Sequence, residues 1–391
     1  MSVPIGFLRR KLRDRDVRQT IGQVAVLLVL AGLFYVVVVN AIASMARLGM
    51  QTGFGFLGSV AGFDVTQKLI AYGQGSTYGR VLLVALLNTL LAAAGGIVLA
   101  TILGFLLGIA RLSSNWLLST LVGAYVESVR NIPLLLFVLV CYHPLLGALP
   151  PARDSLGVGG VVFLNNRGLS VPAPDSASAF IAVPLVLVAA LLGARWLKGW
   201  AARRQAATGQ IFPALAASLG LTVGLSLLAL AAGAAATGWD VPRMGRFGVS
   251  GGTVVLPELV AIVLALTIYT AAFIAEIVRG GILAVSVGQR EAARALGLKP
   301  GRVLRLVILP QALRVILPPL MNQYANIVKN TSYGAIVAYP ELVQVFMGTT
   351  LSQTGHAIEI TAITLAIYLA INLALSAAMN WYNRRIALVT R

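Results

Sequence analysis

The sequence predicts an all-α, polytopic membrane protein with about eight transmembrane helices. Hydrophobic residues make up 58% of the 391-residue chain, charged residues make up only 11%, and the mean hydropathy is +0.88. A soluble core cannot hide so much apolar side-chain surface. The apolar residues also fall into runs of roughly 18 or more, which is the length that a helix needs to cross a bilayer.

Eight such runs follow one another along the chain. Each is expected to be a helix, because in hydrocarbon every backbone amide must be hydrogen-bonded within its own segment. The first run has about 20 residues, more than the core of a cleavable signal peptide, so we expect it to be retained. The second contains GFLLG, Gly104 to Gly108, whose small residues allow a neighbouring helix to approach closely. The expected helices lie near 21–42, 82–110, 117–142, 179–197, 212–236, 256–279, 310–329 and 357–381.

The distribution of Lys and Arg predicts that both termini lie in the cytoplasm. With eight crossings the termini share one side, and an inside N-terminus places 20 Lys and Arg residues inside against 8 outside. Cytoplasmic loops of membrane proteins carry such an excess. The basic residues lie in short clusters between apolar runs and not along a polar face. This argues against nucleic acid as a partner, despite the net charge of +18.

The most informative segment is the basic, glycine-broken stretch EAARALGLKPGRVLRLVILP at residues 291–310. In the predicted topology it faces the cytoplasm. Its pattern predicts two short helices, 286–296 and 302–309, joined by a turn in which Gly297 is a left-handed C-cap. The second helix is expected to stop where Pro310 opens the next membrane helix.

The first of these short helices offers a low-profile surface to a partner. Its small alanines can fit into a partner's groove, while polar contacts of the charged neighbours can fix the position of the helix in that groove. The bare letters EAA would favour an ordinary amphipathic interfacial loop. The residues that we expect to make the contact are Arg290, Glu291, Ala292, Ala293, Ala295, Leu296 and Gly297.

Four features recur in this segment at fixed spacing: Glu291-Ala292-Ala293, Gly297, the aliphatic Val307 and Leu309-Pro310. Together they resemble the EAA loop of ABC importer permeases, in which the position of Val307 is usually isoleucine. The strings YVESVRNIPLLLFVLV, YTAAFIAEIVRGGILAV and LPQALRVILPPLMNQYANIVKN extend the resemblance to the permease subunit of polar amino-acid importers. The additional spans resemble the longer permeases of general L-amino-acid importers.

The resemblance implies a type I ABC importer permease core that is interrupted by an insertion. Residues 1–80 would hold an N-terminal cytoplasmic tail, the first helix and a periplasmic loop. Residues 81–142 would form the first part of the core, and 143–250 an inserted loop with two extra helices. Residues 251–391 would form the second part of the core, with the EAA coupling loop at 286–310.

The resemblance also implies a transport subunit and not an enzyme. Such a subunit translocates L-amino acids across the bacterial inner membrane, using ATP that a separate subunit hydrolyses. The implied partners are ABC ATPase subunits, a second, non-identical permease subunit, a periplasmic amino-acid-binding protein and the lipid bilayer. ATP and Mg would be bound by the ATPase and no cofactor by this chain, which contains no GxxxxGK[ST] stretch.

Two pairs of ionisable residues lie within expected spans at the spacing i,i+3, Glu127 with Arg130 and Glu276 with Arg279. At this spacing the two charges share a helix face and can neutralise each other. Alternatively, charges of both signs would line a pathway for a zwitterionic amino acid. For the polar residues among the candidates, hydrogen bonding between helices is the competing interpretation. The candidate pathway residues are Glu127, Arg130, Asn322, Asn326, Lys329, Asn330 and Thr331.

No catalytic or metal site is expected. The two histidines, His143 and His356, fall just outside spans without convergent partners and are expected in solvated loops. The alternative function is a self-sufficient ion- or proton-coupled secondary transporter of small polar solutes, a class usually marked by inverted repeats. The two Glu-x-Val-Arg strings hint at a repeat, but the segments that flank them do not match.

Overall fold

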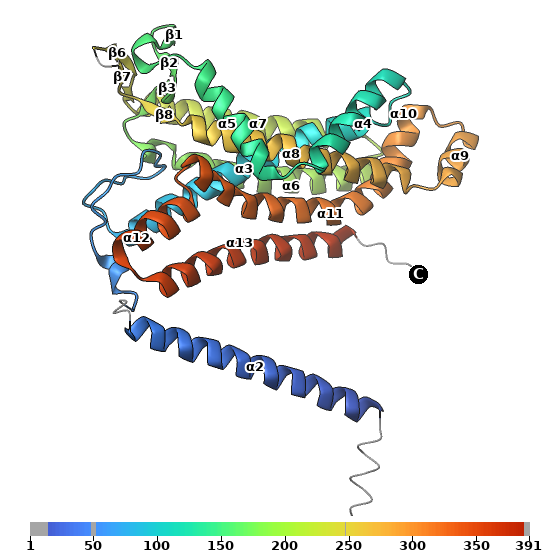
Figure 1. Ribbon diagram of the computed structural model, residues 1–391. Helices are drawn as coiled ribbons and strands as arrows, with labels where there is room; N and C mark the ends of the chain where they lie inside the picture. Colours follow the sequence, from blue (N-terminus) through green and yellow to red (C-terminus); the bar gives the residue numbers. More distant parts are fainter. Residues whose placement is uncertain (1–14, 48–51, 247, 387–391) are drawn as a thin grey trace, which may run out of the picture.

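The computed structural model describes residues 15–47, 52–246 and 248–386; the predicted tail before residue 15 lies outside this part of the chain. Among the described residues, seven helices are long and apolar enough to cross a membrane, and one bent pair brings the number to eight. The predicted helical membrane architecture is therefore confirmed. Figure 1 shows α9 (Val287–Ala295) at the same end of the molecule as the last turns of α13 (Ala357–Ile386), with the strands at the opposite end.

Two helices, α3 (Tyr78–Ala110) and α8 (Pro257–Leu283), form the centre of the bundle and share its most extensive helix contact. Glycines allow this approach. A Cβ atom added at Gly104 would lie 2.5 Å from a branched side chain of α8, and one added at Gly108 would lie 2.7 Å from another. The close helix contact predicted for GFLLG is thus confirmed.

The predicted span 117–142 is not one continuous helix. It consists of α4 (Trp116–Arg130) and α5 (Leu134–Ala148), which are bent by 105° relative to each other. The break falls at Pro133, whose ring removes a backbone donor and disfavours the helical conformation of the residue before it. Both halves pack against α8. The prediction of one uninterrupted helix, which followed hydropathy alone, was wrong at this proline.

The predicted stop before Pro310 is also wrong. The chain passes from α10 (Pro300–Val303) through a π-helical turn (Leu304–Ile308) directly into α11 (Leu309–Asn330). In this turn the Leu309 N–H donates to the carbonyl of Leu304, five residues back. A π turn widens the helix locally, so the Pro310 ring fits without breaking it.

After α11 the chain returns along α3 before its last span. Leu342 N–H donates to Thr89 Oγ1 at 3.0 Å, and Asn88 Nδ2 donates to the Pro340 carbonyl at 2.9 Å. These buried hydrogen bonds satisfy polar groups where the helix is broken, as hydrocarbon requires. The return path is made of η5 (Thr331–Val337), η6 (Leu342–Thr350) and α12 (Leu351–Thr354), followed by α13 (Ala357–Ile386).

The two long connections on either side of the insertion contain β structure that the all-α prediction did not include. Short strands from both connections form one antiparallel sheet in the order β1-β2-β3-β8, so the two connections lie at the same end of the molecule. The strands of this sheet are β1 (Leu156–Val158), β2 (Val162–Asn165), β3 (Gly168–Val171) and β8 (Thr253–Val255). Two smaller ladders pair β4 (Ala173–Pro174) with β5 (Trp239–Asp240) and β6 (Arg243–Gly245) with β7 (Gly248–Ser250).

The extra helices have little cover from the core. The span within α2 (Arg15–Arg47) has no buried residue, and α2 lies apart from the bundle in Figure 1. The inserted helices α6 (Ala182–Thr208) and α7 (Ala214–Ala236) pack against each other, with further contacts to η3 (Ala177–Phe180). The insertion is therefore a helical hairpin beside the core.

One histidine departs from the expectation of a solvated loop. His356 is only 6% exposed, and its ring stacks on Phe56 with 4.6 Å between the ring centroids. Phe56 belongs to η1 (Gly55–Gly58), which packs against the N-terminal end of α3. The ring of His356 thus helps to close this end of the core.

Candidate functional site

The segment that carries the EAA pattern has the predicted helix-turn form. Helix α9 begins after Ser286 and ends before Leu296, and Gly297 follows with a φ of +76°. The Gly297 N–H donates to the Arg294 carbonyl at 2.9 Å, which satisfies one of the last carbonyls of the helix. The left-handed C-cap conformation of Gly297 is confirmed.

The predicted coupling residues divide into an outward and an inward set. Leu296, at the end of α9, is 82% exposed. In contrast, Ala293 is only 5% exposed. The outward set also contains the exposed residues Glu291, Ala292, Ala295 and Gly297.

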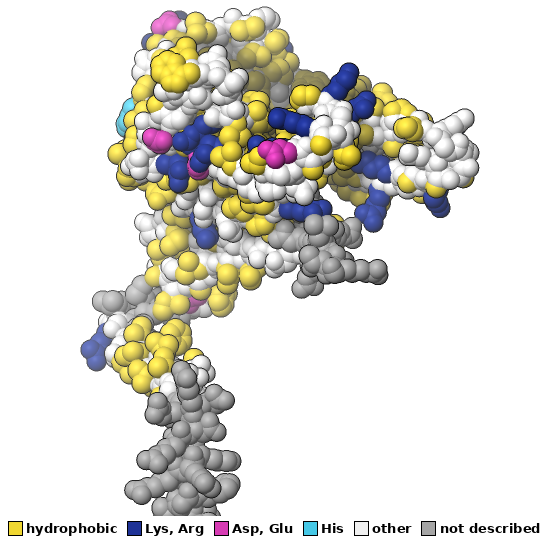
Figure 2. All heavy atoms as spheres, turned by 90° about the vertical axis from the view of Figure 1, so that its right-hand side faces the viewer, with side chains coloured by type: hydrophobic (Ala, Val, Ile, Leu, Met, Phe, Trp, Pro, Cys, Tyr) yellow, Lys and Arg dark blue, Asp and Glu magenta, His cyan; other side chains and the backbone are white. Residues whose placement is uncertain are grey.

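Arg290 connects α9 with the end of α8. Its Nη2 atom donates to the carbonyls of Ile282, at 3.3 Å, and Val285, at 3.1 Å. A cation at the carboxyl end of a helix is stabilising, because the last carbonyls carry partial negative charge. Arg290 therefore links α9 to the C-terminal end of the central helix α8 by two hydrogen bonds. Figure 2 shows the face that carries this segment, where Lys and Arg side chains lie among apolar ones.

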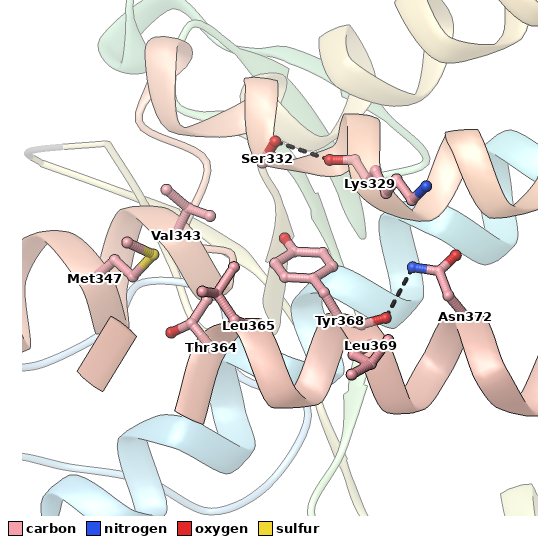
Figure 3. Close-up of a pocket in the computed structure, with 9 residues that line it drawn as sticks. All are labelled: Lys329, Ser332, Val343, Met347, Thr364, Leu365, Tyr368, Leu369 and Asn372. Atoms are coloured by element: carbon pink, nitrogen blue, oxygen red, sulfur yellow. Dashed lines mark hydrogen bonds between the residues drawn. The ribbon is translucent and has the colours of Figure 1, made fainter. Parts of the chain in front are cut away.

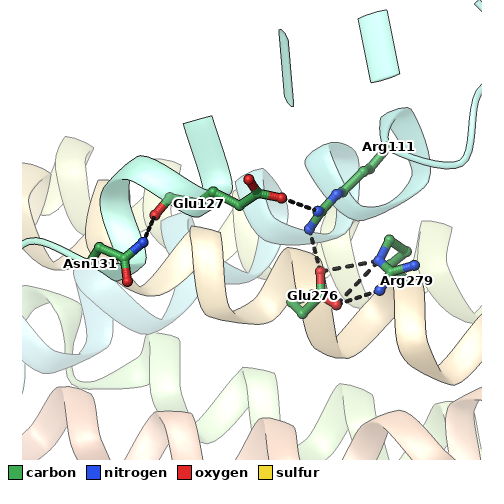
Figure 4. A network of polar contacts seen from close by, with 5 residues as sticks. All are labelled: Arg111, Glu127, Asn131, Glu276 and Arg279. Atoms are coloured by element: carbon green, nitrogen blue, oxygen red, sulfur yellow. Dashed lines mark hydrogen bonds and ion pairs between the residues drawn. The ribbon is translucent and has the colours of Figure 1, made fainter. Parts of the chain in front are cut away.

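A charge network joins α3, α4 and α8 near the same end of the bundle (Figure 4). Arg111, at the C-terminal end of α3, contacts the carboxylates of both Glu276 on α8 and Glu127 on α4, the latter at 3.1 Å. Arg279 pairs with Glu276 at 2.6 Å, as its i,i+3 spacing predicts. One guanidinium thus ties three helices together.

The other predicted pair does not form. Glu127 turns to Arg111, and the Arg130 guanidinium lies over the ring of Phe273, 5.4 Å from its centroid. The prediction that Glu127 and Arg130 neutralise each other was wrong, because Arg111 from another helix reaches the carboxylate. A cation over an aromatic face is itself a favourable contact.

The polar residues of α11 also divide by position. Asn322, Asn326 and Lys329 recur at the spacing of one helix face and are exposed. The structure records no hydrogen bond from either asparagine side chain to another described residue. In contrast, Thr331 is fully buried, with its hydroxyl donating to the Val328 carbonyl at 2.7 Å. Asn330 is half-buried beside it.

Lys329 leads into a groove of about 450 Å³ between η6 and α13 (Figure 3). A groove of this size can hold a small organic ligand. Two buried polar atoms on α13, Thr364 Oγ1 and Asn372 Oδ1, have no hydrogen-bond partner among the described residues. The other lining residues are Ser332, Val343, Met347, Leu365, Tyr368 and Leu369.

A buried carboxylate lies behind this groove. Glu341 is 0% exposed and accepts hydrogen bonds from the N–H groups of Val343, at 2.9 Å, and Gln344, at 2.8 Å. The hydroxyl of Tyr368, a groove residue, donates to the same carboxylate at 3.2 Å. Lys329 therefore places a positive charge at the opening of the groove. The wall carries the Tyr368 hydroxyl, which is hydrogen-bonded to the Glu341 carboxylate.

Glu341, Tyr368, Thr364 and Asn372 were missed by the sequence analysis. Glu341 falls between the predicted spans 310–329 and 357–381, so a search for ionisable residues within spans passes over it. Its position in YPEL, directly before another apolar run, is the signal that could have revealed it. The α13 residues give no such signal, because Tyr, Thr and Asn are common where helices contact each other.

Comparison with known proteins places this architecture in a family. The family model for the binding-protein-dependent transport system inner membrane component matches residues 96–388. The general L-amino acid transport system permease protein AapQ of Rhizobium johnstonii is 46% identical over 383 residues, 98% of this chain and 96% of the relative. The putative amino-acid ABC transporter permease protein YhdX of Escherichia coli is 48% identical over 373 residues, 95% of this chain and 94% of the relative.

A solved structure of an amino acid ABC transporter with histidines covers 79% of this chain and 95% of its own, with 20% identity and a TM-score of 0.47. The family match covers well over half of the chain and includes the α9 segment. The relatives support the importer subunit and not the self-sufficient secondary transporter. The chain belongs to the family of binding-protein-dependent transport system inner membrane components.

Proposed function

We propose that this chain is the permease subunit of an ABC importer that moves L-amino acids across the bacterial inner membrane. The names of the relatives AapQ and YhdX support the substrate class. The excess of Lys and Arg on one side supports an orientation with both termini in the cytoplasm. In this orientation the sheet β1-β2-β3-β8 faces the periplasm, where a binding protein would deliver its amino acid.

The ATPase subunit docks on the C-terminal part of α9, from Arg290 onward, and on the turn after it. The observation that carries this proposal is the 82% exposure of Leu296 beside left-handed Gly297, on a segment that Arg290 ties to α8. An exposed large apolar side chain on a small helix is a typical anchor for a partner's groove. ATP and Mg would be held by that partner.

Motion of α9 reaches the membrane core through α8. Glu276 on α8 is held by Arg111, so a shift of α8 would strain or release the contacts of Arg111 with α3 and α4. Breaking and re-forming these ion pairs would give the bundle the discrete arrangements that alternating access requires. The chain's own part in the cycle is to convert a push at α9 into a rearrangement of three helices.

The exposed face of α11 borders the pathway, which this chain shares with a second, non-identical permease subunit. Asn322, Asn326 and Lys329 offer neutral dipoles and a positive charge to a passing zwitterion. These groups can contact it without binding it too tightly for release. In the groove, Lys329 would pair with the substrate carboxylate. The unpartnered oxygens of Thr364 and Asn372 would accept from its ammonium group.

The test of the docking site is the variant Gly297→Asp in the assembled transporter. At a φ of +76° a side chain is strained, and the new carboxylate would lie beside Leu296. We expect ATP-dependent uptake to fall at least about tenfold, the equivalent of 1.4 kcal/mol, and less ATPase to co-purify.

Gly288→Asp is the matched control. Gly288 is an exposed glycine in the first turn of the same helix, with ordinary φ and no atom within 4 Å of an added Cβ. An acidic residue is favourable at a helix N-terminus. Normal uptake and normal co-purification of Gly297→Asp would contradict the docking site, as would an equal loss in Gly288→Asp.

A further inference from the structure

The cytoplasmic-side end of α6, in the inserted hairpin, gathers basic and aromatic side chains. Arg195, Lys198, Arg203 and Arg204 lie within ten residues and are all exposed. The whole hairpin, residues 182–236, contains no Asp or Glu. Four positive charges therefore stand at the end of a membrane helix without an acidic neighbour on their own element.

No other part of the described chain neutralises these charges. The recorded ion pairs join Lys68 to Asp64, Arg111 to two glutamates, and Arg279 to Glu276. The hairpin packs mainly on itself, and only 11% of the α6 span and 6% of the α7 span are buried. Within the described chain this end of α6 is therefore exposed, and its positive charges are not compensated.

On one face of α6, aromatic and basic side chains contact one another. Trp196, Trp200, Arg203 and Arg204 follow the spacing i, i+4, i+7, i+8, which places them on the same face. The Arg204 guanidinium lies 5.3 Å from the centroid of the Trp200 ring, and its Nη2 donates to Gln210 Oε1 at 3.0 Å. We call these four residues the Trp-Arg face.

The connection between α6 and α7 packs against the Trp-Arg face. Trp200 meets Phe212 edge-on, with 5.4 Å between the ring centroids, while Trp196 is 65% exposed. Gly209, with a φ of +72°, ends α6 and turns the chain toward Phe212. The Arg204 side chain is thus positioned before any ligand arrives, which lowers the entropic cost of binding.

We propose that the Trp-Arg face binds the phosphate headgroup of an anionic lipid in the leaflet that the end of α6 reaches. Guanidinium groups donate two parallel hydrogen bonds to a phosphate. Exposed tryptophan is favoured at the depth of the headgroups, with its ring among the first methylenes. A general excess of cytoplasmic Lys and Arg accounts for the charge but not for its fixed stacking on tryptophan.

The test is native mass spectrometry of the full-length chain, purified in a neutral detergent and titrated with phosphatidylglycerol or phosphatidylcholine. We expect phosphatidylglycerol to bind the wild-type chain at least about tenfold more tightly, because each basic residue near the surface adds to the attraction. Arg203→Gln with Arg204→Gln should remove most of this preference. Arg203→Lys with Arg204→Lys keeps the charge and should retain part of it.

The matched control is Arg243→Gln with Arg246→Gln, two exposed arginines at the strand end of the molecule. It should keep the full preference for phosphatidylglycerol. Equal lipid binding by the Arg203/Arg204 glutamine variant and the wild type would overturn the proposal. So would an equal loss in the control, no preference over phosphatidylcholine, or displacement of the lipid by millimolar inorganic phosphate. Trp196→Ala, at an exposed position, should weaken binding of phosphatidylglycerol without any change in folding.

Discussion

The central helix α8 and the inserted hairpin α6–α7 are similarly apolar, yet they occupy opposite environments. In α8, 56% of the most apolar stretch is buried inside the chain; in α6 and α7 the values are 11% and 6%. The difference lies in what the helices meet. Glycines of α3 receive the branched side chains of α8, whereas Gly220 and Gly224 of α7 have no neighbouring atom within 4 Å of an added Cβ.

Hydropathy therefore determines which segments cross the membrane, but not which of them form the core. Lipid chains are as apolar as leucine, so burial against protein depends on close packing and on polar contacts. The charged residues follow the same division. Glu276 and Arg279 of α8 are paired, while Lys198 and Arg203 of α6 have no ion-pair partner among the described residues.

The largest effect is expected from a bulky residue at the α3–α8 contact. Gly108→Leu would force a side chain into the backbone and side chains of α8, where even a Cβ lies 2.7 Å from its neighbour. Overpacking costs about 1–3 kcal/mol and more where backbone must move. We expect loss of most folded protein, measured by size-exclusion chromatography and thermal unfolding in detergent. Gly224→Leu should change neither, and an equal loss in both would refute the comparison.

The next effect concerns transport. Lys329→Gln replaces the lysine with a neutral, polar and slightly shorter side chain, and so removes the positive charge at the mouth of the groove. We expect ATP-driven uptake to fall about tenfold, with normal amounts of assembled transporter, because a charge-assisted contact contributes about 1.5–3 kcal/mol. Lys198→Gln removes an equal charge from the hairpin and should leave uptake unchanged. If uptake and assembly of Lys329→Gln fall together, the lysine is structural.

A smaller effect is expected at the charge network. Glu276→Gln leaves the guanidinium groups of Arg111 and Arg279 close together without their shared carboxylate. Because the carboxylate is 27% exposed, we expect a loss of about 1–2 kcal/mol, between the values for surface and buried pairs. The measurement is the unfolding free energy in detergent and urea. Glu291→Gln, at an exposed residue without an ion pair, is the control and should be neutral.

The smallest effect on the core is expected from removing the hairpin. Its two ends meet, because the Ser176 N–H donates to Thr237 Oγ1 at 3.2 Å and β4 pairs with β5. Residues 177–236 can thus be replaced by a short Gly-Ser linker. We expect the unfolding midpoint of the core to move by only a few degrees. A chain that fails to fold without the hairpin would show that α8 and α6–α7 are not independent.

The sequence predicted what depends on local composition. Seven of the eight spans, the helix-turn form around Gly297 and the small-residue contact at Gly104 to Gly108 follow from apolar length, turn chemistry and residue size. The pairing of Glu276 with Arg279 also follows from its spacing. These features need no knowledge of which helices are neighbours.

What the sequence could not predict depends on contacts between distant segments. Glu127 pairs with Arg111 and not with Arg130, because α3 and α4 end close together. Glu341 is buried because the chain turns back along α3, and the four-stranded sheet joins strands from both sides of the insertion. The groove beside Lys329 exists only where three such segments meet.

The central claim is that work done by a separate ATPase enters this chain at α9. The most direct measurement is amino-acid accumulation in sealed vesicles that contain this chain and the proposed second permease subunit, with the binding protein inside or outside as orientation requires. We predict accumulation above the external concentration only when the ATPase subunit and ATP are present on the face that carries Leu296. The same accumulation without the ATPase, driven by an ion gradient, would contradict the account.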